Sequence, residues 1–242
     1  MRSRPMSDLP KFMAISILRF RKPRAVETFA HSHLDTKVRY STRRADSFLL
    51  DGTIAPEANV FCHIALCDEK RTCDEATEEL IHEAQILDGV AESIQLSLRP
   101  FMHRGAINWL DPVNPGPILE THGKPRNVSP VVSMTSGGFI EPGAQMERVR
   151  RTLSNTVMVA NEVLKADGLQ FRRVFSLCGN FGDAITFTVW KSEDALATFA
   201  YRSSEHLDRV KPQLESGFHF DRTSFTRFTT DRTQGEWEGV RL

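Results

Sequence analysis

Residues 198–206, with the sequence TFAYRSSEH, bring together side-chain types that can hold a cofactor. Phe199, Tyr201 and Arg202 precede His206 within two turns of a predicted helix. Neutral imidazole is the commonest side chain among metal ligands, aromatic rings form an apolar wall, and a guanidinium pairs with acidic groups. This combination suits a flat apolar ligand that carries a metal ion and anionic substituents.

Arg202 lies one helical turn before His206 and faces roughly the same side, where it is placed to meet an acidic group of such a ligand. Trp190, Phe187 and Phe225 occupy predicted strands, and we expect them to line the cavity. Each residue also has a plainer interpretation. Arg202 would be a solvated helix cation, the strand aromatics would be ordinary core residues, and His206 would be one polar residue among eight histidines.

The elements that position these residues occur twice along the chain. A weak internal repeat of roughly 110 to 120 residues contains a strand, a long helix, two strands, a second helix and a strand, which is the βαββαβ order of a ferredoxin-like unit. In the first half the predicted elements are 12–20, 23–45, 46–53, 59–68, 72–87 and 92–101. In the second half they are 131–139, 143–168, 170–179, 183–192, 192–216 and 219–228.

The repeat predicts an α+β fold in which tandem ferredoxin-like repeats pack as a pseudo-dimeric αβ barrel. Helices would cover one face of each four-stranded sheet, and the two open faces would bury each other. The expected organisation is an N-terminal tail at 1–11, a first repeat at 12–110, a linker rich in Pro, Gly and Asn at 111–130, and a second, cofactor-binding repeat at 131–242.

Polar residues mark the starts of the second helix in each half. Thr72 and Glu75 have the spacing of a capping box. Ser192 is a predicted N-cap, followed by Glu193 and Asp194 in the first turn, where the helix dipole favours acidic side chains. We therefore expect both helices to begin at these residues.

The two halves match at their tails, where Trp109 and Trp237 are expected to cover the barrel ends, but they differ at His206. Counting back from the glycines that end the second helices, the counterpart of His206 is Glu78. The first-half segment around it, CDEATEE, is acidic and small, whereas TFAYRSSEH is aromatic and basic. A ligand bound at a single site would break the symmetry in this way, so we place the cofactor in the second half.

The composition argues against several other classes of function. The 31 basic and 31 acidic residues cancel to a formal net charge of +0, which gives no reason to expect nucleic acid as a partner. The first apolar run, FMAISIL, is too short for a signal-peptide core or a membrane span, so we expect a cytoplasmic protein without a transmembrane segment. The four cysteines form no CxxC pair, which favours free thiols over a zinc site.

The second half also resembles the spheroidene monooxygenase family, the haem-containing carotenoid oxygenases. It shares a strand that ends at a Trp-x-Ser-Glu turn, a Phe-Ala-Tyr helix followed by a histidine, a Gly-aromatic step and a final Phe-x-Arg-Phe strand. The residues that carry these motifs are Trp190, Ser192, Glu193, Phe199, Ala200, Tyr201, His206, Gly217, Phe218, Phe225, Arg227 and Phe228. The resemblance is weak over 12–109 and good from about 160 to 228, and the helix start recurs in antibiotic-biosynthesis-type monooxygenase domains of the same fold.

The chain departs from the family after its tail tryptophans, where family members have a glycine-rich turn and this chain has NWLDPVNPG and EWEGVRL. The resemblance therefore extends to the fold and the haem, and not to the substrate. It implies haem b, with His206 as the iron ligand. The other residues expected around this group are Arg202, Tyr201, Phe199, Trp190, Phe187 and Phe225.

The resemblance implies a haem-dependent monooxygenase that acts on an apolar organic substrate with O₂ and an electron donor. Two alternatives stay open. One is a haem enzyme with non-oxygenase chemistry, such as an aldoxime-dehydratase-like reaction, and the other is a cofactor-free αβ-barrel protein that binds a small ligand.

The internal repeat suggests that one chain supplies what two chains supply in single-unit relatives, so a monomer and a homodimer are both open.

Overall fold

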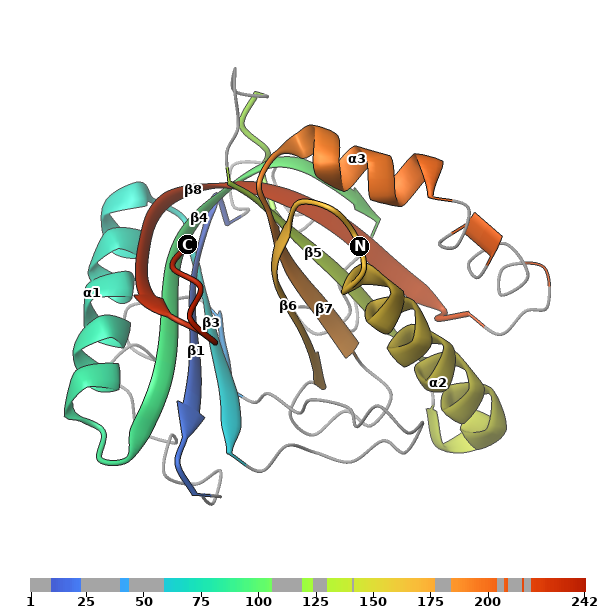
Figure 1. The fold of residues 1–242 in the computed structure, drawn as a ribbon, viewed down its shortest axis with the longest axis horizontal. Coiled ribbons are helices and arrows are strands. Elements are labelled where there is room, and N and C mark those ends of the chain that lie inside the picture. Colours follow the sequence, from blue (N-terminus) through green and yellow to red (C-terminus); the bar gives the residue numbers. More distant parts are fainter. Residues whose placement is uncertain are drawn as a thin grey trace, which may run out of the picture.

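One antiparallel sheet of eight strands runs through the computed structural model (Figure 1). The structure describes residues 10–22, 40–43, 59–105, 119–123, 130–140, 142–176, 184–203, 207–208, 215 and 219–242. In sheet order the strands are β2 (Tyr40–Arg43), β3 (Val60–Cys67), β1 (Phe12–Phe20), β4 (Val90–Gly105), β8 (Arg222–Glu236), β5 (Val131–Gly138), β7 (Ala184–Trp190) and β6 (Leu169–Ser176). The helices are α1 (Lys70–Ile86), the short 3₁₀ helix η4 (Pro142–Gln145), α2 (Met146–Val163) and α3 (Glu193–Arg202).

The strand order is symmetric about the pair formed by β4 and β8. On one side the order is β2-β3-β1-β4, and on the other it is β8-β5-β7-β6. In each set the first strand along the chain lies between the third and the last. The β4–β8 ladder extends from Ser93 opposite Glu236 to Gly105 opposite Ser224, so the two halves of the chain share one continuous sheet.

The sheet separates an inner core from a face covered by helices. Figure 1 shows the curled sheet with α1 outside the first-half strands and α2 and α3 outside the second-half strands. Both halves contribute buried side chains to one inner cluster, which includes Met13, Ile15, Ile17, Cys62, Ile64, Leu96, Leu98, Val132, Met134, Phe171, Phe175, Ile185, Phe187, Val189, Phe228 and Trp237. The α+β class follows the prediction.

Alternation along the strands explains which side chains enter this core. In β7, Ile185 and Phe187 face inwards, while Thr188 and Trp190 face the helices. In β1 both faces are apolar, because α1 covers the face opposite the core. Cys62 and Cys67 of β3 point to opposite faces, as their odd separation predicts.

Three element boundaries differ from the prediction. The capping box at Thr72 is wrong, because α1 begins at Lys70 with Glu69 as its N-cap, so Thr72 lies inside the first turn. The long helix expected over 23–45 is wrong at its end, where β2 pairs with β3. The rest of that helix and the strand expected over 46–53 lie outside the described residues.

The helix expected over 192–216 is also interrupted. Ser192 is its N-cap as predicted, with its side-chain oxygen accepting the Ala195 N–H at 3.2 Å. However, α3 ends at Arg202, where Ser203 adopts an extended conformation and its N–H bonds to the Thr198 carbonyl at 3.1 Å. Two consecutive serines follow Arg202, and serine hydroxyls compete with helical backbone hydrogen bonds.

The C-terminal tail returns to the sheet. Trp237 is buried in the inner core, edge-on to Phe171 with ring centroids 5.8 Å apart. The guanidinium groups of Arg19 and Arg173 lie 4.4 and 5.0 Å from the Trp237 ring. Trp109, the matching residue of the first half, lies outside the described residues.

Within the described part of the chain, no helix combines the length and apolar character that crossing a membrane requires.

Candidate functional site

The predicted cofactor segment begins in α3, on the helix-covered face of the second-half strands. Leu196 anchors this helix in a buried cluster that also contains Val131, Val163 and Trp190. Trp190 is only 1% exposed, and its indole N–H donates to Thr188 Oγ1 at 2.9 Å. This hydrogen bond fixes the indole plane and satisfies its polar atom, as a buried tryptophan requires.

Phe199 extends this aromatic surface outwards. Its ring lies 5.5 Å from the Trp190 ring, at an interplanar angle of 32°. Phe199 comes from α3 and Trp190 from the end of β7, so the turn between the two elements aligns the rings. Trp190 is buried, so of the two rings it is Phe199 that a ligand in this region would contact.

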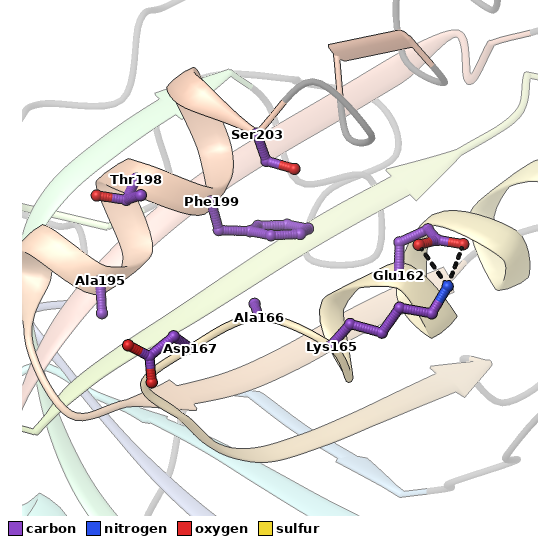
Figure 2. Close-up of a pocket in the computed structure, with 8 residues that line it drawn as sticks. All are labelled: Glu162, Lys165, Ala166, Asp167, Ala195, Thr198, Phe199 and Ser203. Carbon is purple, nitrogen blue, oxygen red and sulfur yellow. Dashed lines mark hydrogen bonds and ion pairs between the residues drawn. The ribbon is translucent and has the colours of Figure 1, made fainter.

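A pocket of about 380 Å³ opens between α3 and the C-terminal end of α2 (Figure 2). Figure 2 shows Phe199 pointing from α3 into the space between the helices, towards the segment that follows α2. The lining residues are Glu162, Lys165, Ala166, Asp167, Ala195, Thr198, Phe199 and Ser203. A volume of this size is within the range of small-molecule sites, roughly 300–1,000 Å³.

A glycine allows the floor of this pocket to form. Gly168 has φ +83°, and a Cβ built on it would lie 2.6 Å from the Cβ of Ala195. Only glycine adopts this conformation without strain and also permits such a close approach between backbone and helix. The turn between α2 and β6 therefore packs directly against the start of α3.

A buried cation joins α3 to β8. Arg227 has a side chain that is only 11% exposed, and it forms an ion pair with Glu193 at 3.1 Å. Its other terminal nitrogen donates to the Tyr201 hydroxyl at 3.0 Å, and its guanidinium lies 5.6 Å from the Tyr201 ring centroid. Arg227 was noted only through the family resemblance, since no spacing in the sequence links it to Glu193.

Hydroxyl side chains line the same face of the sheet. Ser133 and Thr135 of β5 stand opposite Thr188 and Thr186 of β7, and Ser133 stands opposite Arg227 of β8. Thr188 Oγ1 also donates to the Ser133 carbonyl at 3.3 Å. Polar and apolar residues alternate along β5 and β7, and this pattern predicts the polar stripe. The site predicted from the sequence did not include it.

The structure brings most of the predicted site residues to one face. Phe199 and Trp190 contact each other. Tyr201 packs beside Arg227, and Arg202 is exposed at the last turn of α3. Phe225 lies two residues before Arg227 on β8 and is 46% exposed.

Two predicted site residues do not join this group in the described structure. Phe187 is fully buried in the inner core, with its ring edge-on to Phe171 at 6.2 Å. It lies on the opposite face from Trp190 because the two residues are three positions apart along a strand, an odd offset. His206 lies outside the described residues, three positions after Ser203 of the pocket.

Three of the other histidines make hydrogen bonds that give them a structural role. His103 Nδ1 lies 2.8 Å from Thr226 Oγ1, His122 Nε2 lies 3.3 Å from the Lys11 carbonyl, and His219 Nδ1 lies 2.8 Å from the Phe220 carbonyl. Burial lowers the pKa of His103, which favours its neutral form. These interactions match the plainer interpretation of a histidine in a folded protein.

The described residues around α3 match a haem group only in part, since Phe199 lines the pocket but so do the carboxylates of Glu162 and Asp167. Within the described ranges, no group of three or more His, Cys, Asp and Glu residues is arranged to hold a metal ion. A haem would need as few as one side chain of the protein as an iron ligand, because the porphyrin nitrogens also hold the metal. Phe199 and the cationic Arg202 at the end of α3 would suit an apolar ring that carries acidic groups.

Comparisons with known proteins show a likeness in fold only. The sequence matches no protein-family model and no curated protein. A solved structure of aldoxime dehydratase has a TM-score of 0.60 at 9% identity and covers 95% of this chain and 83% of that chain. The aldoxime dehydratase OxdRE in complex with butyraldoxime has a TM-score of 0.57 at 10% identity, with 95% and 81% covered.

A structure of an antibiotic biosynthesis monooxygenase is also similar, with a TM-score of 0.32 at 11% identity, and covers 44% of this chain and 96% of that chain. At these identities, a likeness concerns only the arrangement of the elements. The chain therefore has an α+β fold that it shares with aldoxime dehydratase over nearly its whole length.

Proposed function

We propose that the chain is a haem-dependent monooxygenase of an apolar organic substrate, with the iron of haem b held by His206. The observation that supports this most is the pocket beside α3, which Phe199 and Ser203 help to line and which lies three residues before the histidine singled out by the sequence. The reaction would need O₂ and an electron donor. We place the protein in the cytoplasm, as a monomer or a homodimer without a nucleic-acid partner.

We further propose that the halves 12–110 and 131–242 are tandem ferredoxin-like repeats that form a pseudo-dimeric αβ barrel, joined by the linker 111–130. The symmetric strand order and the shared inner core support this view. In such a barrel, side chains fill the inner face of the sheet. A cofactor would therefore bind on the other face of the second half, where α2 and α3 lie.

A haem, when bound, supplies redox and Lewis-acid chemistry that no side chain provides. The residues of this chain would bind and orient it. Phe199 would contact the flat ring, with the buried Trp190 packed against Phe199, and Arg202 would pair with an acidic substituent. Arg227, which is neutralised by Glu193, would hold α3 on the sheet. The stripe of hydroxyl groups on β5 and β7 would supply hydrogen bonds on the sheet side.

A second candidate is an aldoxime-dehydratase-like reaction on haem. The full-length likeness to two aldoxime dehydratase structures favours it, whereas the motifs around α3 favour the oxygenase. The third candidate is a cofactor-free protein that binds a small ligand in the pocket beside α3. These candidates differ in whether haem binds and in whether O₂ is consumed.

The test uses the full-length protein and haem. We expect haem to bind with one equivalent per chain and to produce an intense visible absorption band. The loaded protein with a reductant should then consume O₂ in the presence of an apolar organic compound. Anaerobic conversion of butyraldoxime without O₂ consumption would instead establish the second candidate, and a protein that gains no band on haem titration would contradict both haem functions.

A further inference from the structure

Two buried thiols lie beside each other where β3 meets α1. Cys67 is the last residue of β3, and Cys73 lies in the first turn of α1. Their side chains are 2% and 0% exposed, and both belong to the apolar cluster between α1 and the sheet. The two thiol groups lie close enough for each to shift the pKa of the other. The short turn between strand and helix thus holds two free cysteines in contact.

The surroundings make the two thiols chemically unequal. The Cys73 sulfur lies 3.4 Å from the Ser97 hydroxyl of β4, and it also accepts a hydrogen bond from the Leu98 N–H. The interaction between the two thiols lowers the pKa of Cys73 and raises that of Cys67. Cys73 is therefore the nucleophile of the pair, and Cys67 keeps its proton.

A third cysteine provides an internal comparison. Cys62 lies on the same strand as Cys67, but it faces the inner core among aliphatic side chains. Burial alone raises the pKa of Cys62, and within the described residues no hydrogen-bond donor to its sulfur offsets this. A thiol in such surroundings stays protonated and unreactive.

We propose that Cys67 and Cys73 are a modification site at which a small peroxide produces a reversible intramolecular disulfide. The Cys73 thiolate attacks one oxygen of the peroxide and forms a sulfenic acid, and the other oxygen leaves as hydroxide, or as alkoxide from an alkyl peroxide. The Cys67 thiol then displaces water from the sulfenic sulfur and closes the disulfide. In total, two thiols are oxidised, one peroxide is reduced, and with hydrogen peroxide two waters form.

The burial of the pair determines which oxidant fits. Hydrogen peroxide is comparable in size to water and can reach sites that a peptide disulfide cannot enter. The product would link the end of β3 to the first turn of α1, the helix that covers β1, β3 and β4. This site is independent of the haem function, because it lies in the first half and involves no residue of α3.

The sequence offers a direct assay. Trypsin cleaves after Lys70 and Arg71, between the two cysteines, so a disulfide would join the peptides 45–70 and 72–104. Folded protein is treated with hydrogen peroxide, its remaining thiols are alkylated under denaturing conditions, and the digest is analysed by mass spectrometry. We expect the linked pair of peptides to appear in wild type and to separate on treatment with dithiothreitol.

Three single variants distinguish the partners, because peptide 45–70 contains both Cys62 and Cys67. The linked pair should persist in Cys62→Ala and disappear in Cys67→Ala and in Cys73→Ala. Circular dichroism establishes that each variant is folded before treatment. The proposal is overturned if the link persists in Cys67→Ala, if it forms only in unfolded protein, or if folded wild type yields no linked peptides at a peroxide dose that oxidises free cysteine.

Discussion

At the scale of single residues, the predicted aromatic site divides between two faces of one strand. Trp190 joins Phe199 on the helix side, while Phe187 belongs to the inner core. The alternation of β7 is legible in the sequence and predicts this division. The Arg227–Glu193 ion pair was not predictable, because it depends on how β8 is placed under α3, which no local pattern encodes.

Alanine substitutions at Phe187 and Phe199 should therefore differ in their effects on stability and on haem binding. Phe187→Ala removes a fully buried ring and is expected to lower the free energy of unfolding by about 3–5 kcal/mol. Phe199→Ala removes a half-buried ring at the pocket and should cost about 1–2 kcal/mol, but it should weaken haem binding several-fold. Urea denaturation and haem titration measure the two quantities. A Phe187→Ala protein of normal stability with weakened haem binding would place the cofactor on the inner face instead.

At the scale of elements, strand positions were largely predictable, and helix ends only in part. Seven of the eight strands overlap a predicted strand. Ser192 caps α3 as expected, whereas α1 begins two residues before the predicted Thr72. A serine or threonine followed three residues later by glutamate occurs by chance inside helices as well, so the pattern alone does not fix the first residue.

The two predicted caps provide a matched pair of substitutions. Ser192→Ala removes the acceptor of the Ala195 N–H and is expected to cost about 1 kcal/mol. Thr72→Ala replaces a residue inside a helical turn by a better helix former, so it should be neutral or stabilising by up to about 0.5 kcal/mol. Thermal or urea unfolding of both variants measures the difference. Equal losses at the two positions would show that Thr72 caps α1 after all.

At the scale of the whole molecule, the sequence predicts two similar halves, but it does not predict which strands join them. The structure joins β4 and β8 into a long antiparallel ladder, so the sheet is continuous. Near its two ends, Gly105 and Gly235 adopt φ values of +91° and +101°. A Cβ on Gly105 would meet the Thr223 carbonyl, and one on Gly235 would meet the Ser93 carbonyl. The need for glycine at these two positions can be explained only when the partner strand of each is known.

Glycine substitutions test how much this ladder contributes to stability. Gly235→Ala combines a positive φ with a clash against the partner strand, and we expect a loss of about 3 kcal/mol or more. Gly239→Ala is the control, since its φ is +78° and no atom lies within 4 Å of the added Cβ. It should cost only about 1 kcal/mol. If chemical denaturation finds the same loss at both positions, close pairing of β4 with β8 does not constrain Gly235.

The central claim is that His206 holds a haem iron, and replacing its imidazole tests this most directly. Haem is titrated into wild type, His206→Gly and His82→Ala, a control that lacks an exposed histidine of α1. We expect the visible absorption band in wild type and in His82→Ala, its loss in His206→Gly, and its return when free imidazole is added to that variant. An unchanged band and haem affinity in His206→Gly, or no haem binding by wild type, would contradict the claim.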